Sequence, residues 1–226
     1  MKTNSIALAV MVKTPGLSPI KTRLASKIGV ENALEFYKKS VKVLSLTLEN
    51  LSLEFDFKPY FSDFKPYFAH AEPGASDQWN QFATCYQGEG TLGQRLDHVY
   101  SHLLKSHKAV VIIGSDLPQL SKFTLTECFN SLAKDPHSFC IGPTEDGGFY
   151  LIGGSSPIPS DVWLETPYSV PHTRDLLCKK LQGHGQIKFL KLQFDIDEWE
   201  DLIKLNANLP NLVLECPALA LFNEIK

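Results

Sequence analysis

Long apolar runs alternate along the chain with segments whose apolar residues recur every three or four positions. The two clearest runs are SIALAVMV at residues 5–12 and AVVIIG at residues 109–114. Runs of this kind are typical of strands buried on both faces of a parallel sheet. Shorter apolar stretches predict strands at 139–142, 149–153 and 187–194, and helical spacing or capping signals predict helices at 31–50, 92–107, 124–134 and 198–209.

The alternation of these strands and helices predicts an α/β protein of three layers, in which helices cover both faces of a mostly parallel sheet. No linker or low-complexity tract divides the chain, so residues 1–226 form one predicted domain. In sheets of this kind ligands bind in the crevice beyond the carboxyl ends of the strands. Functional residues are therefore expected in the loops that follow the predicted strands.

The hexapeptide DFKPYF occurs twice, at residues 56–61 and 63–68. A repeat architecture needs about three stacked units or more, so two copies predict a local duplication. Proline has no N–H to donate to a strand ladder, and Pro59 and Pro66 therefore predict an edge strand or a path outside the sheet.

The charge of the chain excludes some classes of partner. The formal net charge is −3, which gives no basic surface for nucleic acid or for an anionic membrane. The apolar stretch at residues 6–12 is too short to span a bilayer. The chain has five cysteines and no C-x-x-C pair, which favours a reducing compartment and predicts a cytoplasmic protein.

Acidic residues follow two of the predicted strands. Asp116 comes two residues after the second long run, and Asp195 and Asp197 follow the last predicted strand, where a period of two puts both on one face. A hard cation such as Mg²⁺ or Mn²⁺ takes one or two protein carboxylates and completes its shell with phosphate oxygens and water. These three aspartates are the predicted metal ligands. Two alternatives stay open: Asp116 as a turn residue before Pro118, and Asp197 in a capping box with Glu200.

Cationic residues gather after the first predicted strand, at Lys13, Lys21 and Arg23, in a chain that is otherwise slightly acidic. Cationic side chains at this place are suited to hold a di- or triphosphate and to offset its charge as a bond breaks. The alternative is solvated surface charge. No Walker-type glycine-rich motif is present to hold phosphates instead.

The segment TEDGG at residues 144–148 connects two predicted strands. Its paired glycines, Gly147 and Gly148, let the backbone approach a ligand or adopt a positive φ, and Asp146 would then hold a hydroxyl group or a sugar. A plain hairpin turn is the alternative, because Asp-Gly is a strong turn signal.

Residues 88–93, GEGTLG, match the G-x-G-x-x-G fingerprint of dinucleotide-binding units and open a predicted helix. A dinucleotide-binding oxidoreductase is therefore a rival interpretation. Against it, residues 80–86 form a poor buried strand, whereas the fingerprint requires a strand that runs into the first glycine. His98 and His102 lie one helical turn apart without a third zinc ligand nearby in the sequence, so packing or surface roles are favoured.

Six segments resemble, in order, a bacterial family of uncharacterised proteins, DUF2064. They are KTRLA at 21–25, QGEGTLGQRL at 87–96, IIGSDLPQL at 112–120, IGPTEDGGFYLIGG at 141–154, WLETPYSVPHT at 163–173 and DIDEWEDL at 195–202. The resemblance implies a GT-A, nucleotide-diphospho-sugar transferase-like fold, related to phospholactate guanylyltransferase and molybdenum-cofactor nucleotidyltransferases.

The resemblance also implies roles for particular residues. It implies Lys21 and Arg23 as phosphate-binding residues, and Asp116 with Asp197, or Asp195, as metal ligands. It implies Gln87 and Gly93 as part of a base-recognition segment, and Asp146 as the residue that faces the acceptor or the sugar.

The expected function is that of a metal-dependent transferase acting on a nucleotide or nucleotide-diphospho-sugar, with Mg²⁺ or Mn²⁺ as cofactor and a small molecule as acceptor. Nucleotidyl transfer and glycosyl transfer both stay open. The rivals from other classes are the dinucleotide-binding oxidoreductase and a nucleotide-binding regulator without turnover.

Overall fold

A computed structural model describes residues 2–54, 61, 63–135 and 137–224. Within these residues seven strands form one sheet in the order β3-β2-β1-β4-β6-β5-β7. The strands are parallel except β6, which runs antiparallel to both of its neighbours. Their bounds are β1 Thr3–Val12, β2 Asp63–His70, β3 Ala83–Tyr86, β4 His107–Gly114, β5 Ser138–Pro143, β6 Phe149–Gly154 and β7 Gln186–Phe189.

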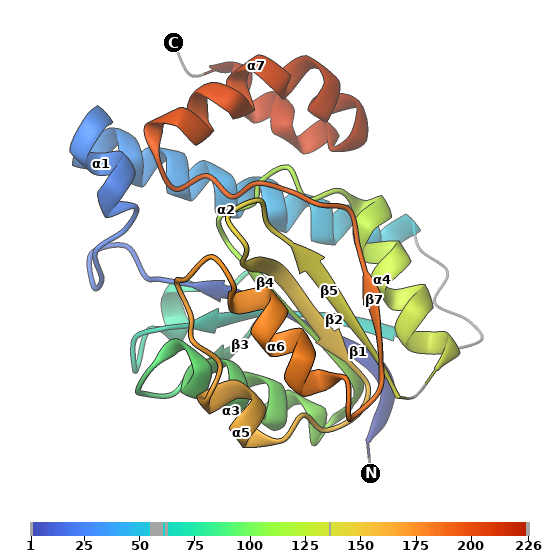
Figure 1. Cartoon of the computed structure of the whole chain (residues 1–226). Helices are drawn as coiled ribbons and strands as arrows, with labels where there is room; N and C mark the ends of the chain where they lie inside the picture. The colour runs from blue at the N-terminus through green and yellow to red at the C-terminus, as the bar shows by residue number, and fades with distance from the viewer. Residues whose placement is uncertain (1, 55–60, 62, 136, 225–226) are drawn as a thin grey trace.

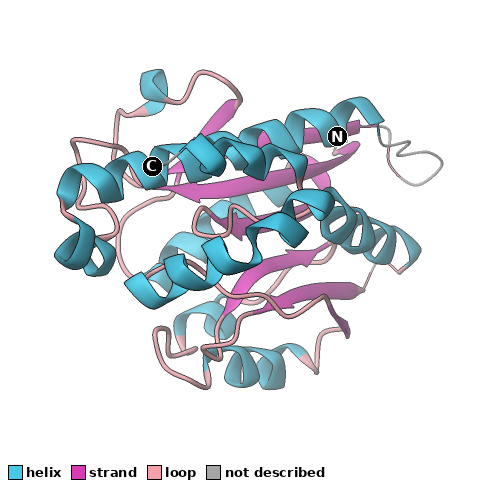
Figure 2. Cartoon of the chain, turned by 90° about the horizontal axis from the view of Figure 1, so that it is seen from above, coloured by secondary structure: helices cyan, strands magenta, loops and turns pink. Residues whose placement is uncertain are grey.

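Helices cover both faces of this sheet (Figures 1 and 2). The α-helices are α1 Thr22–Ile28, α2 Val30–Glu54, α3 Leu92–Leu104, α4 Lys122–Lys134, α5 Ser160–Leu164, α6 Thr173–Leu181 and α7 Trp199–Glu215. Two 3₁₀ helices, η1 Ser76–Gln78 and η2 Pro217–Glu224, complete the described elements. The predicted α/β fold with a mostly parallel central sheet is confirmed.

The alternation of side chains along β1 explains why the sheet carries two cores. Ile6 and Leu8 point to the face that α2 and α4 cover, and Ala7 and Ala9 point to the face that α3, α5 and α6 cover. Both cores are fully apolar at this strand, as a strand buried on two faces requires. A third apolar cluster lies outside the sheet, where α7 and η2 pack on α1 and α2 (Figure 1).

The second DFKPYF copy lies inside the sheet, so the predicted edge position is wrong. It forms most of β2, which pairs with β1 on one side and with β3 on the other. Pro66 is tolerated because the ladder with β3 begins only at Tyr67, so one side of β2 is still unpaired at the proline. Five of the six residues of the first copy, 56–60, lie outside the described residues.

The largest differences from the predicted bounds are at the ends of β7 and α7. The last strand ends at Phe189, and residues 190–197 continue along the sheet with isolated hydrogen bonds, such as Gln193 N to Pro143 O at 3.0 Å. Helix α7 passes through Pro210 to Glu215, although a proline usually ends or kinks a helix. In the described part of the chain, no helix is long and apolar enough to cross a membrane.

Candidate functional site at the carboxyl ends of the strands

The loops after β1 and β4 meet at one edge of the sheet because these two parallel strands are neighbours. The first loop leads to Lys21, and the second begins with Ser115 and Asp116. The segment that leads into α7 crosses the same edge: the backbone N–H of Ile196 donates to the carbonyl of Asp116 at 3.0 Å. This hydrogen bond places Asp197 beside the loop after β4. In Figure 1, α1 and the start of α7 lie side by side.

The Lys21 side chain joins these three segments. Its Nζ lies 2.6 Å from Asp116 Oδ1 and 2.8 Å from Asp197 Oδ1, and it also donates to the carbonyl of Ile196. The Lys21 side chain is 4% exposed, whereas those of Asp116 and Asp197 are 43% and 44% exposed. Two predicted metal ligands and a predicted phosphate-binding residue therefore form one compact cluster, which we call the lysine–aspartate cluster.

The charge state of Lys21 follows from these contacts. Burial by itself would lower the pKa of the ammonium, but the ion pairs and hydrogen bonds with Asp116 and Asp197 outweigh burial and raise it. Lys21 is thus a fixed positive charge beneath two half-exposed carboxylates.

Asp195 and Asp146 extend the acidic region. Burial raises the pKa of Asp195 to about 6, and the negative charges of Asp197, Asp146 and Asp116 add to this effect. Charges interact in this way only when they are near one another. All four aspartates singled out in the sequence therefore lie within electrostatic reach at this edge of the sheet.

Replacing Asp195 by Asn is expected to stabilise the protein at pH 7.5 by about 1–2 kcal/mol, after allowance for solvent screening. The folded-state pKa is raised to about 6 from 3.8, so this carboxyl favours folding below pH 3.8 and loses that contribution as the pH rises to about 6. Denaturant unfolding of both proteins at pH 7.5 and pH 4 measures the effect. The difference should shrink at pH 4; an equal difference at both values would contradict the assignment.

The connection from β5 to β6 is a hairpin turn held to α6. Asp146 Oδ1 accepts hydrogen bonds from Thr144 Oγ1 at 2.5 Å and from the Gly148 N–H at 2.9 Å. Gly147 has φ 87°, and its carbonyl accepts from the Arg174 N–H at 3.0 Å. The alternative interpretation of residues 144–148, a hairpin turn, is therefore correct. The turn also brings Asp146 toward the acidic region.

The remaining predicted residues lie outside the lysine–aspartate cluster. Lys13 is exposed, and Arg23 is exposed and pairs with Glu198 at 3.4 Å. Gln87 is buried, and its amide donates to the carbonyls of Val12 and Ala69. Gly93 is buried where α3 contacts α5: a Cβ atom there would meet the carbonyl oxygen of Trp163 at 2.5 Å. The described contacts thus give Gln87 and Gly93 structural partners, and their role in base recognition stays a prediction.

The structure at the start of α7 shows that the predicted capping box of Asp197 with Glu200 is wrong. The capping box joins Glu198 and Asp201, and Asp201 also accepts from the Asp197 N–H at 3.0 Å. The Asp197 side chain is therefore not a cap, and it is directed to Lys21 instead.

Several contributors to the site carry no sequence signal of their own. Gln119 donates through its amide to the carbonyl of Phe194, which holds the crossing segment to the loop after β4. Lys204 of α7 pairs with Glu145 of the β5–β6 turn. Both are long-range contacts of common polar residues, so no local pattern could have indicated them.

The carboxylates fit a hard divalent cation that keeps water and phosphate oxygens as further ligands. Asp116 Oδ1 and Asp197 Oδ1 contact the same nitrogen, so they can lie no farther apart than the sum of their two distances to it. Among residues 2–54, 61, 63–135 and 137–224, no three His, Cys, Asp or Glu side chains are already gathered tightly enough to hold a metal ion. The arrangement suits Mg²⁺ or Mn²⁺, which need few protein ligands, better than a closed structural site.

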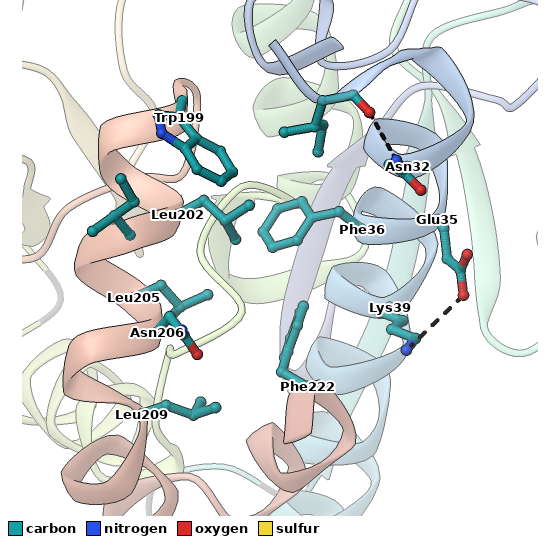
Figure 3. A pocket seen from close by; sticks show the side chains of 12 residues that line it. Asn32, Glu35, Phe36, Lys39, Trp199, Leu202, Leu205, Asn206, Leu209 and Phe222 are labelled. Atoms are coloured by element: carbon teal, nitrogen blue, oxygen red, sulfur yellow. Dashed lines mark hydrogen bonds and ion pairs between the residues drawn. The ribbon is translucent and has the colours of Figure 1, made fainter. Parts of the chain in front are cut away.

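A separate cavity of about 470 Å³ lies between α2, α7 and η2 (Figure 3). Its floor is apolar, with Phe36, Leu202 and Phe222 directed into it, and Asn32 and Glu35 stand at the rim. Its lining includes none of the four aspartates of the acidic region.

The rival dinucleotide site does not have the required topology. Strand β3 does run into Gly88, but β3 is an edge strand, and the helix after GEGTLG leads to β4, which β2 and β1 separate from β3. A dinucleotide-binding unit joins neighbouring strands through this helix. The described role of the segment is to begin α3 with a Thr91–Gln94 capping box.

Comparison with known proteins supports these observations at the level of fold. Residues 63–170 match the family model described as "Uncharacterized protein conserved in bacteria (DUF2064)". This segment includes Asp116 and Asp146 but neither Lys21 nor Asp197. No curated protein matches the chain.

Three solved structures illustrate the structural likeness. A protein from Desulfovibrio desulfuricans G20, which carries the provisional name nucleotide-diphospho-sugar transferase, is 21% identical, with 98% of this chain and 95% of that chain covered and a TM-score of 0.80. A 4-diphosphocytidyl-2C-methyl-D-erythritol synthase from Anaerococcus prevotii DSM 20548 is 13% identical, with 92% and 96% covered and a TM-score of 0.56.

The third structure is CMP:2-keto-3-deoxy-manno-octonic acid synthetase complexed with CTP. It is 11% identical, with 92% of this chain and 99% of that chain covered and a TM-score of 0.55. At these identities the likeness concerns the fold. The family resemblance predicted from the sequence is thus confirmed over residues 63–170, and the chain has the nucleotide-diphospho-sugar transferase-like fold.

Proposed function

We propose that this protein is a metal-dependent transferase that acts at the phosphates of a nucleotide or a nucleotide-diphospho-sugar. The observation that carries the proposal is the lysine–aspartate cluster, in which Lys21, Asp116 and Asp197 meet from distant parts of the chain. The cluster lies at the carboxyl edge of the sheet, where ligands of open α/β sheets bind. The names of the structural neighbours support the same class of substrate.

In this proposal Asp116 and Asp197 hold Mg²⁺ or Mn²⁺, with Asp195 beside them. The bound ion would offset the negative charge that develops on the nucleotide phosphates. Lys21 and Arg23 bind phosphate oxygens as cationic donors, and Lys13 adds positive charge at the same loop. Asp146 and the backbone of Gly147 and Gly148 face the acceptor or the sugar. The protein acts mainly by holding the reacting groups in position.

Two reactions share this chemistry. In nucleotidyl transfer an acceptor phosphate attacks the α-phosphorus of a nucleoside triphosphate, and pyrophosphate leaves. In glycosyl transfer the acceptor attacks the sugar, and a nucleoside diphosphate leaves. The two named synthases among the structural neighbours make cytidylyl products, as their names state, and this favours testing nucleotidyl transfer first.

The test is to incubate the protein and Mg²⁺ with each nucleoside triphosphate, and separately with each common nucleotide sugar, in the presence of a pool of small sugar phosphates and alcohols. Release of pyrophosphate would assign nucleotidyl transfer, and release of a nucleoside diphosphate would assign glycosyl transfer. Tight nucleotide binding without any product would favour the regulator instead. Binding of NAD that needs no metal would contradict the proposal.

A further inference from the structure

We propose that Lys21 is a built-in counter-ion that occupies the metal-binding oxygens until a nucleotide arrives, so that metal and nucleotide bind cooperatively. This inference rests on the proposed function, because it assumes that Asp116 and Asp197 hold a divalent cation. It adds that the metal site is closed by the protein's own ammonium group when no nucleotide is bound.

The geometry makes the ammonium and a metal ion direct competitors. Lys21 Nζ contacts the Oδ1 atoms of both Asp116 and Asp197, at 2.6 and 2.8 Å. With the carbonyl of Ile196 as a third acceptor, all three donors of the ammonium have a partner. A divalent ion held by these two carboxylates would lie against this positive charge, so it would bind well only after Lys21 moves away.

The backbone conformation of Lys21 is unusual for a residue with a side chain. Lys21 has φ 48° and ψ 46°, in the left-handed region that residues other than glycine seldom adopt. Residues in such regions persist where surrounding interactions hold them, and they are common at functional sites.

A nucleotide supplies the acceptors that Lys21 needs after it leaves the carboxylates. The residue ends the loop after β1, and its flexible four-carbon stem can turn the ammonium toward phosphate oxygens beside the same carboxylates. Phosphate binding would then stabilise the displaced lysine and leave the carboxylates of Asp116 and Asp197 available to hold the metal. By linkage, the nucleotide must raise the affinity for metal by the same factor by which the metal raises the affinity for nucleotide.

The experiment measures binding of Mn²⁺ alone by calorimetry to the wild type and to Lys21→Gln. Removing the competing charge should make Mn²⁺ bind more tightly to Lys21→Gln, by on the order of tenfold or more. Lys27→Gln, which removes an exposed cation from α1, the helix that begins directly after Lys21, is the matched control and should change this affinity little. Circular dichroism shows whether each variant is folded.

The first part of a second measurement uses the wild type alone, so that part does not depend on the folding of Lys21→Gln. Each of the four nucleoside triphosphates is titrated with and without Mn²⁺, with the binding of Mn²⁺ to free nucleotide subtracted. At least one nucleotide should bind on the order of tenfold more tightly with the metal, and this enhancement should shrink in Lys21→Gln.

The outcomes separate the two proposals. If Lys21→Gln binds Mn²⁺ no more tightly than the wild type, although Asp116→Asn loses the binding, the counter-ion role of Lys21 is overturned and the metal site stands. If no nucleotide shows metal-dependent binding and Mn²⁺ binds none of these proteins, the proposed metal-dependent function itself is overturned.

Discussion

Asp116→Asn is expected to lower metal-dependent turnover on the order of 100-fold or more while the protein stays folded. The amide keeps the size of the side chain but removes the negative charge that a divalent cation needs. Asp116 is 43% exposed, and Lys21 retains Asp197 and the Ile196 carbonyl, so the expected loss of stability is only about 1 kcal/mol. Product release measures the first effect, and denaturant unfolding measures the second.

The matched control is Asp161→Asn, which removes an exposed carboxylate from the start of α5, on the opposite face of the sheet from α2 and α4. It should leave turnover within about twofold of the wild type and stability within about 0.5 kcal/mol. Turnover of Asp116→Asn at the rate of this control would show that Asp116 is not a metal ligand.

Gly147→Ala is expected to destabilise the protein by about 2–4 kcal/mol. Gly147 has φ +87°, and a Cβ atom built on it would lie 1.8 Å from the carbonyl oxygen of Pro171. The nearest atoms all belong to the backbone of Pro171, so the clash can be relieved only if the β5–β6 turn and the segment before α6 move apart. That movement would also break the hydrogen bond from the Arg174 N–H to Gly147 and would shift Asp146.

Gly183→Ala is the control for this prediction, because a Cβ atom at Gly183 has nothing within 4 Å and its φ is not in the left-handed region. Chemical denaturation should place Gly183→Ala within about 0.5 kcal/mol of the wild type. If Gly147→Ala unfolds at the same denaturant concentration as Gly183→Ala, the close packing of the turn against residues 170–174 is wrong.

The sequence predicted the sheet most reliably where burial is complete on both faces. Strands β1 and β4 were clear because every position from Ile6 to Val10 and from Ala109 to Ile113 is apolar and buried. Strand β2 was misassigned because Pro66 is a poor strand residue in most contexts. Its place in the sheet depends on where the ladder with β3 begins, and a single strand's sequence does not contain that information.

The candidate site was predictable in its members but not in its contacts. The positions of Asp116 and Asp197 after predicted strands indicated that both lie at the carboxyl edge of the sheet, where ligand-binding residues of such sheets gather. That Lys21 pairs with both depends on the hydrogen bond between Ile196 and Asp116, which joins segments 80 residues apart. Local spacing cannot predict a contact of this kind.

For Gln87 and Gly93, the residue type and the position in the sequence did not determine the role. A glycine and an amide in a loop before a helix are compatible with ligand binding, but they are equally compatible with close packing and with hydrogen bonds to the backbone. The structure shows such packing at Gly93 and such hydrogen bonds at Gln87. Only the position of the neighbouring elements distinguishes these uses.

The distribution of the lysine–aspartate cluster along the chain has a consequence for biosynthesis. Lys21 and Asp116 leave the ribosome long before Asp197, and chains are made from the amino terminus onward. A nascent or truncated polypeptide that stops before Ile196 therefore contains all seven described strands but cannot assemble the complete cluster. Cleavage before Ile196 would therefore separate Asp197 from Lys21 and Asp116 and would remove the proposed metal-dependent activity.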